Sequence, residues 1–290
     1  MNIRFSILAI LTAALLPQKS FSWGKMGHAV VAAVAERHLT PEAKQQLDKY
    51  LHGADIHHIA SDADKYRAYW TIDLGFHPTN PDAARLKWLK KFDFSTPTNI
   101  SPVSHSVTVD KNYRSYRSDN DNGAYINNCA YYLEQYAKKL KKGAETMDAK
   151  ERYKEIALIV HLIGDMHCPQ HIVYIPQDPA KGSFMVNFRG KEINYHGFWD
   201  TRIVVTDSPA DTLEYARMID TATEKEIRHI TKGNIYKWVQ QGAEASWPAH
   251  KYQSGDTLPD DAIEQYKPLV YSQLRNAGYR LAAYLNNIFK

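Results

Sequence analysis

Two short runs rich in histidine and aspartate carry the chemistry that this sequence could perform. His161 and Asp165 are four residues apart, so on a helix both side chains project from one face. His196 and Asp200 repeat this spacing. At about 100° per residue, His171 returns to within about 80° of the His161 face, although Pro169 makes that phase approximate. Imidazole nitrogens and carboxylate oxygens suit zinc, so the two runs predict a zinc site.

The first run ends a segment that is apolar on nearly every side. Residues 156–163 are all apolar except His161. A helix of that kind is buried, and a buried imidazole or carboxylate needs a partner to offset its lost hydration. We therefore expect a buried helix over residues 150–167 that carries its ligands into the interior.

The beginning of the chain offers a second group of ligands. Arg4, an apolar run over residues 7–16 and the small residues of Ser20-Phe21-Ser22 have the layout of a secretory signal. The apolar run is too short to span a bilayer, so we expect cleavage after Ser22. The new α-amino group and the carbonyl of Trp23 could then close a five-membered chelate ring on a metal, with His28 beside them. As an alternative, His28 is an ordinary surface residue of a first helical turn.

A third stretch places Asp62 and Asp64 just before Arg67. Acidic residues of this kind are also common at a solvated helix start, and Arg67 could pair with either carboxylate. The residues alone leave both roles open.

The length and composition of the chain are typical of one globular domain. The chain has 290 residues and a formal net charge of +4, which falls to +2 when Arg4 and Lys19 leave with the signal. That excess does not by itself indicate nucleic-acid binding, because binding a polyanion through Lys and Arg alone usually requires a strong basic patch. We expect residues 1–22 to be removed and residues 23–290 to form a single domain. The two cysteines, Cys129 and Cys168, could form a disulfide or remain free.

Helical periodicity dominates the rest of the chain, so the sequence predicts an all-α fold with the ligands in a cleft between helices. Phe184–Tyr195 alternates apolar and polar residues around Arg189-Gly190-Lys191 and predicts one small β-hairpin. Residues 92–122 are polar and rich in Pro, Ser, Asn and Asp, which predicts a long surface loop. The other expected helices are 26–38, Pro41–Leu51, one capped by Asp119 and reaching Leu140, 209–219, 221–231, 233–246 and Pro268–Ile288.

Taken together, these motifs resemble the trinuclear-zinc, single-strand-specific nuclease and 3′-nucleotidase family. That family includes fungal secreted and plant bifunctional nucleases and shares its fold with bacterial zinc-dependent phospholipase C. Its signature occurs here in order: Trp-Gly-x-x-Gly-His at 23–28, Ala-Asp-x-x-Arg at 63–67, a further His, His-x-x-x-Asp-x-x-x-x-x-His at 161–171, and His-x-x-x-Asp at 196–200.

The resemblance implies three Zn²⁺ ions. Asp165 would bridge two of them, Arg67 would neutralise charge on the phosphoryl group, and Asn80 would contact the nucleotide base. Asp64 fits the motif rather than Asp62, because it stands three residues before Arg67. The implied metal ligands are Asp64, His77, His161 and Asp165 for one ion, Trp23 and His28 with Asp165 for the second, and His171, His196 and Asp200 for the third.

Some positions depart from the family pattern. The family has Trp where Asp62 stands, and it follows the ligand histidine with an aromatic and an aliphatic residue, whereas Pro78 and Thr79 follow His77. An aromatic residue that could stack on a base is therefore missing beside His77. Tyr113, Tyr116 and Phe184 are candidate replacements.

The implied activity is hydrolysis of single-stranded DNA or RNA and of 3′-nucleotides, giving 5′-phosphorylated products. Two alternatives remain open: a phospholipase C-type lipid phosphodiesterase, and a non-catalytic exported metal-binding protein. We expect a secreted or periplasmic protein with no membrane anchor and no required oligomer. Asn99 lies in a glycosylation sequon.

Overall fold

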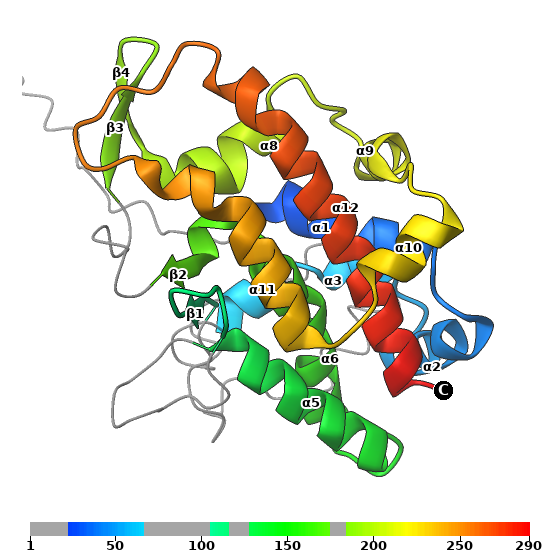
Figure 1. Cartoon of the computed structure of the whole chain (residues 1–290). Helices are drawn as coiled ribbons and strands as arrows, with labels where there is room; N and C mark the ends of the chain where they lie inside the picture. The colour runs from blue at the N-terminus through cyan, green and yellow to red at the C-terminus, as the bar shows by residue number, and fades with distance from the viewer. Residues whose placement is uncertain (1–22, 67–104, 116–127, 175–183) are drawn as a thin grey trace, which may run out of the picture.

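The computed structural model describes residues 23–66, 105–115, 128–174 and 184–290, and these fold mainly into helices (Figure 1). The α-helices are α1 (Lys25–Glu36), α2 (Pro41–Leu51), α3 (Ile56–Ile59), α5 (Cys129–Gly143), α6 (Ala149–Asp165), α7 (Tyr195–Gly197), α8 (Ile203–Val205), α9 (Thr212–Ile219), α10 (Glu224–Ile230), α11 (Ile235–Ser246) and α12 (Ala262–Ile288). Shorter helical turns are η1 (Asp62–Tyr66), η4 (Pro169–His171), the π-helical η5 (Phe198–Arg202) and η6 (Trp247–Lys251). The strands are β1 (Val107–Val109), β2 (Ile172–Tyr174), β3 (Met185–Phe188) and β4 (Lys191–Asn194). The mostly helical class expected from the sequence is confirmed.

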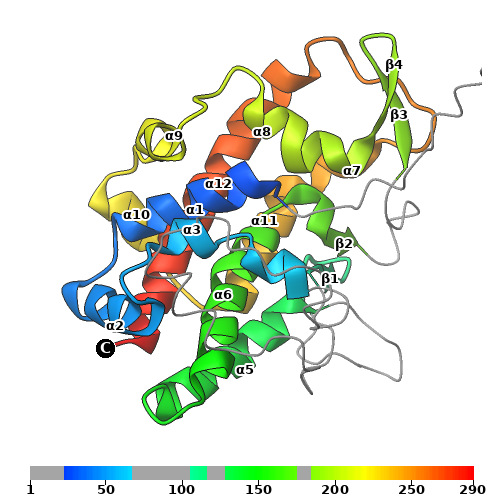
Figure 2. The same ribbon diagram turned by 180° about the vertical axis from the view of Figure 1, so that it is seen from behind.

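Helix α6 is the buried helix that the sequence predicted. Every residue from Tyr153 to Asp165 is buried. Its start is fixed by Asp148, whose carboxylate accepts hydrogen bonds from the amides of Lys150 and Glu151. Helices α11 and α12 lie in front of α1 and α6 in Figure 1 and behind them in Figure 2, so α6 is covered on that side.

Helix α12 packs closely on α1. A Cβ at Gly278 would lie 2.5 Å from Cβ of Val34, so only glycine allows this approach. The expected start near Pro268 was wrong, because α12 begins at Ala262 and continues through that proline. Ala262 and Ile263, which precede the proline, are buried and extend the apolar face of the helix towards its N-terminus. This packing offsets the loss of the backbone hydrogen bond that proline cannot donate.

The predicted hairpin is confirmed as β3 and β4, which pair antiparallel. Arg189 and Gly190 form its turn with φ of 50° and 73°, as a two-residue hairpin turn requires. A second strand pair was not predicted: β1 and β2 pair in parallel, from Val107 opposite Ile172 to Val109 opposite Tyr174. Within 105–115, the expected surface loop was therefore wrong, because the valines of β1 are buried in the core.

The remaining helices lie close to their expected ranges, except α5, whose expected start near Asp119 was wrong because the helix begins at Cys129 after its cap Asn128. Helix α2 begins at Pro41, and Thr40 caps it by accepting the amide of Ala43. Helix α5 begins at Cys129, where the side chain of Asn128 accepts the amide of Tyr131; the expected cap Asp119 lies outside the described residues.

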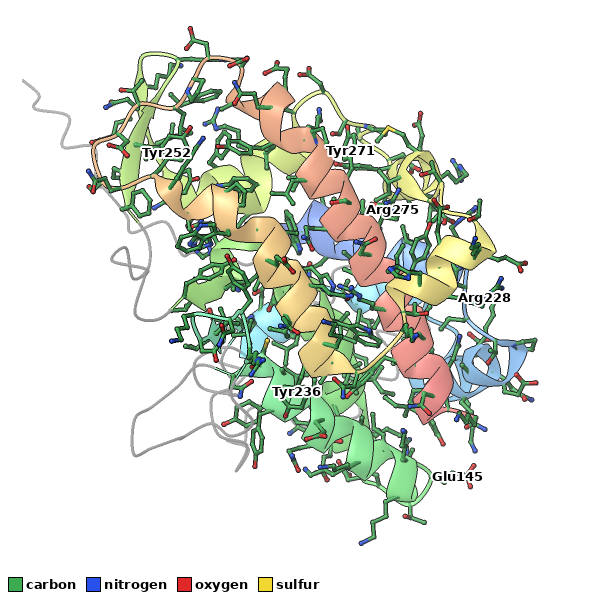
Figure 3. All side chains as sticks on the ribbon, viewed as in Figure 1. Glu145, Arg228, Tyr236, Tyr252, Tyr271 and Arg275 are labelled. Carbon is green, nitrogen blue, oxygen red and sulfur yellow. The ribbon has the colours of Figure 1, made fainter. Side chains whose placement is uncertain are left out.

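A surface hydrogen bond joins α12 to the segment that precedes α10. Arg275 of α12 donates to the hydroxyl of Thr221, which precedes α10, at 3.2 Å (Figure 3). None of the helices in the described part of the chain combines the length and apolar composition needed to cross a bilayer. Cys129 and Cys168 are both buried free thiols, which decides between the two states that the sequence left open.

Candidate metal centre

The last turn of α6 presents His161 and Asp165 together. Nδ1 of His161 lies 2.8 Å from the carbonyl oxygen of Ala60. A carbonyl only accepts, so the proton stands on Nδ1 and Nε2 faces the carboxylate. Nε2 lies 3.3 Å from Oδ2 of Asp165, as the four-residue spacing predicted.

Helix α1 brings His28 to the other oxygen of the same carboxylate. Nε2 of His28 lies 3.2 Å from Oδ1 of Asp165, and its ring stacks on His161 with centroids 3.7 Å apart. A Cβ at Gly164 would lie 2.8 Å from Nδ1 of His28, so glycine makes room for the imidazole. His28 is thus a buried member of the cluster, and not a surface residue of the first turn.

Trp23 lies fully buried beside these groups. The next amide, that of Gly24, donates to the carbonyl oxygen of Asp200 at 2.6 Å. A Cβ at Gly24 would lie 2.5 Å from Oγ1 of Thr201, so the chain passes η5 with little space around it. The start of the expected mature chain is therefore held between α6 and η5.

The two aspartates of η1 contact different parts of the protein. The hydroxyl of Tyr153 donates to Asp62 at 2.5 Å, which ties this carboxylate to the side of α6. Asp64 instead faces the cluster, with Oδ1 3.4 Å from Nε2 of His161. Of the two aspartates, Asp64 is therefore the one that lies at the cluster.

His105 is a member of the cluster that the sequence analysis missed. Its Nδ1 lies 3.0 Å from Oδ2 of Asp165, 3.1 Å from Nε2 of His161 and 3.9 Å from Oδ1 of Asp64. It was missed because it lies in a segment interpreted as a surface loop. The alternating Val107 and Val109 just after it were the available signal of a buried strand.

Three of the predicted site residues cannot be compared with this geometry. Arg67, His77 and Asn80 lie outside the described residues. Of the candidate stacking residues, Tyr116 is also outside them, Tyr113 packs edge-on against Tyr174, and Phe184 packs against Tyr195.

A second cluster forms where η4 meets α7 and η5. Nδ1 of His171 donates to the carbonyl oxygen of His105 at 2.8 Å, which leaves Nε2 unprotonated. That atom lies 3.1 Å from Nε2 of His196, which is itself 3.0 Å from Oδ2 of Asp200. The thiol of Cys168 donates to the other oxygen, Oδ1, at 3.3 Å.

Burial and mutual charge dominate the electrostatics of both clusters. Burial would raise the pKa of Asp165, but the adjacent imidazoles, His161 first, hold it well below its ordinary value. Burial lowers the pKa of His171 to about 3, so this ring is neutral and able to donate a lone pair. Burial raises the pKa of Asp200 to about 6.

The donor set fits metal cations. Both oxygens of Asp165, Oδ1 of Asp64 and Oδ2 of Asp200 are buried and receive no hydrogen bond of good geometry from the described residues. Buried carboxylates are stable only when a positive charge is close. Imidazole nitrogens face the same points, and the groups His28/His161/Asp165, Asp64/His105/His161 and Cys168/His171/Asp200 each place three ligand atoms within 4.8 Å of one another.

The chain is similar to known proteins along most of its length. The sequence profile of the S1/P1 Nuclease family matches residues 23–290. Endonuclease 2 of Arabidopsis thaliana is 24% identical over 307 residues, covering 98% of this chain and 97% of its own length. Nuclease P1 of Penicillium citrinum is 23% identical over 92% of this chain and 97% of its own. Nuclease S1 of Aspergillus oryzae is 22% identical over 97% of each. The chain therefore belongs to the S1/P1 nuclease family.

Proposed function

We propose that this protein is a zinc-dependent hydrolase that cleaves single-stranded DNA and RNA and removes phosphate from 3′-nucleotides, leaving 5′-phosphorylated products on cleavage. The observation that carries the proposal is the position of Asp165, whose two oxygens face different imidazoles: Oδ1 faces His28, and Oδ2 faces His105 and His161. This position supports a carboxylate shared by two neighbouring ions, and family membership supports the reaction class.

The geometry supports an assignment of ligands to three zinc ions. His105 takes the fourth position of the first ion, which the sequence analysis gave to His77, because it lies within 4 Å of the other three ligands. The proposed ligands are Asp64, His105, His161 and Asp165 for the first ion, Trp23 and His28 with Asp165 for the second, and His171, His196 and Asp200 for the third.

Bound zinc ions would lower the pKa of a water molecule and neutralise charge on a phosphoryl group and its leaving oxygen. The protein's own part is to hold the ligands in place and to exclude bulk water. His161 and His171 are fixed through their Nδ1–H groups by the carbonyls of Ala60 and His105, as expected for metal-bound imidazoles. Arg67 and Asn80 remain our proposals for phosphoryl and base contacts.

Export is part of the same proposal. Trp23 would act through its free amino group and carbonyl, so residues 1–22 must be removed before the second ion can bind. The burial of Trp23 and the hydrogen bond from Gly24 to Asp200 support a position of Trp23 beside the proposed ligands. We propose that the mature protein is secreted or periplasmic, without a membrane anchor and without need of an oligomer.

A substrate panel tests the activity against its two rivals. The mature protein, loaded with zinc, is incubated with single-stranded DNA, RNA, a 3′-mononucleotide and phosphatidylcholine. We expect cleavage of the first three and 5′-phosphates on the nucleic acid products. Hydrolysis of the lipid alone would overturn the proposal in favour of a lipid phosphodiesterase. Failure to cleave any of the four with all ions bound would favour a metal-binding protein without catalysis.

A further inference from the structure

A separate set of metal-ligand side chains lies around α3. Asp55, His57 and His58 each offer one ligand atom, and these atoms lie within 4.8 Å of one another. None of the three belongs to the clusters of the metal centre. The two imidazole rings lie with centroids 3.9 Å apart.

Glu36, the last residue of α1, fixes the orientation of His57. One carboxylate oxygen accepts the backbone amide of His57 at 2.9 Å, and the other lies 2.7 Å from Nδ1. A carboxylate accepts, so a proton stands on Nδ1, and in the neutral ring the lone pair is on Nε2. The contact is sheltered, since the side chains of His57 and Glu36 are 11% and 19% exposed. A carboxylate behind an imidazole is the usual support of a metal-bound histidine.

The surroundings favour a cation over an anion. His57 and His58 line a pocket of about 290 Å³ together with Lys25 and Asp211. Asp211 is fixed because its carboxylate accepts the amide of Glu214 at the start of α9. Around the two imidazoles stand the carboxylates of Glu36, Asp55 and Asp211, against the single ammonium group of Lys25 among the described residues that line the pocket.

We propose that Asp55, His57 and His58 bind a further zinc ion, outside the catalytic centre. Two imidazoles and one carboxylate are a donor set that zinc accepts, with water completing a tetrahedron. Ligand atoms on one tetrahedral zinc lie about 3.3 Å apart, so the set must contract from its present spacing. The exposed side chain of Asp55 can move to do this.

Such an ion would stabilise the segment that leads into the catalytic centre. Helix α3 is followed directly by Ala60, whose carbonyl oxygen holds His161, and then by η1 with Asp64. Zinc at α3 would link this segment, through His57 and Glu36, to the end of α1. Zinc binding at this site is therefore expected to raise the melting temperature of the protein.

Equilibrium dialysis of the mature protein against rising zinc concentrations tests the proposal. Zinc per chain is measured for the wild type, for the double variant His57→Gln/His58→Gln, and for His229→Gln, which removes an exposed histidine of α10. We expect the wild type and His229→Gln to bind one more equivalent than the double variant. Equal stoichiometry in all three would overturn the site. Far-UV circular dichroism before zinc addition identifies any variant that fails to fold, and His58→Gln alone then replaces the double variant.

Glu36→Gln provides a sharper test, because it keeps all three ligands and removes only the carboxylate behind His57. We expect the additional ion to bind about 10- to 100-fold more weakly while the other zinc equivalents stay unchanged. An unchanged affinity would overturn the role of Glu36. If inorganic phosphate, and not zinc, raises the melting temperature in a manner that depends on His57 and His58, the pocket is an anion site and the proposal is wrong.

Discussion

His105 and Asp165 are in contact through Nδ1 and Oδ2, at 3.0 Å, although one precedes a short strand and the other ends a long helix. The parallel pairing of β1 with β2 holds this segment in place. Beside this pairing, the carbonyl oxygen of His105 accepts a hydrogen bond from Nδ1 of His171. One residue therefore supplies a side chain to the first cluster and a backbone acceptor to the second.

This relationship predicts different results for two histidine substitutions. His105→Ala should lose about one zinc per chain and most of the nuclease activity, because the proposed first ion would keep only three of its four ligands. His77→Ala should keep its zinc content if His105 is the fourth ligand. Elemental analysis of both purified variants gives the answer. Zinc loss in His77→Ala but not in His105→Ala would restore the original assignment.

Asp165→Asn tests the shared carboxylate. An amide is a weaker ligand and carries no charge, so the two proposed ions would both lose a ligand. We expect at least one zinc to be lost and activity to fall by more than about 100-fold, the usual scale for loss of a group that stabilises charge at a reacting centre. Asp260→Asn, at an exposed position, serves as the control. Wild-type zinc content in Asp165→Asn would contradict the bridge.

The thiol of Cys168 orients Asp200, and the two cysteines allow a matched comparison. Cys168→Ala removes the donor to Oδ1 and should weaken zinc binding by about 10- to 100-fold, as loss of a supporting hydrogen bond does. Cys168→Ser replaces the donor by a hydroxyl and should recover much of the affinity. Cys129→Ser, at the other buried thiol, controls for loss of a buried sulfur. Zinc competition with a chelator measures all three affinities.

Local patterns were enough to predict the parts of the site that lie on regular helices. The four-residue spacing of His161 and Asp165 held because α6 is a continuous helix, and that of His196 and Asp200 held across α7 and η5. His105 was not predicted as a site residue because its partners come from distant segments. The strand pairing next to it involves only three residues in each strand. The alternation of Val107 and Val109 is the local signal of this strand, but it is too short to distinguish the strand from a loop.

The predicted start of α12 was wrong for a related reason. Pro268 is a strong local signal against helix continuation, but local signals carry no information on tertiary packing. Ala262 and Ile263 are buried against the rest of the core, and this contact extends the helix before the proline. Tertiary packing outweighed the local preference.

The N-terminus predicts sensitivity to added residues. A mature protein with one extra residue before Trp23 has no free amino group at Trp23, so the proposed chelate cannot form. We expect loss of about one zinc and of most activity, with the helical circular dichroism retained. Cleavage of the extra residue by a specific protease should restore both. Full activity of the extended protein would contradict the chelate.

Asp220 predicts an acid-dependent loss of stability outside the metal centre. It accepts hydrogen bonds from Arg37, His38 and Tyr279, which joins the end of α1 to α12. Burial would raise its pKa, but these partners, Arg37 first, lower it below the ordinary value. A carboxylate with a depressed folded-state pKa stabilises the protein above its unfolded pKa of about 4, and that stabilisation disappears as the pH falls through the folded-state pKa.

Asp220→Asn should therefore lower the free energy of unfolding by about 2 kcal/mol near pH 6, the scale of a lost hydrogen bond to a charged group. The difference from the wild type should shrink as the pH falls below about 4. Urea denaturation at pH 6 and at pH 3, with Asp260→Asn as the exposed control, measures both values. A difference that stays constant between the two pH values would mean that packing, and not the charge of Asp220, stabilises this contact.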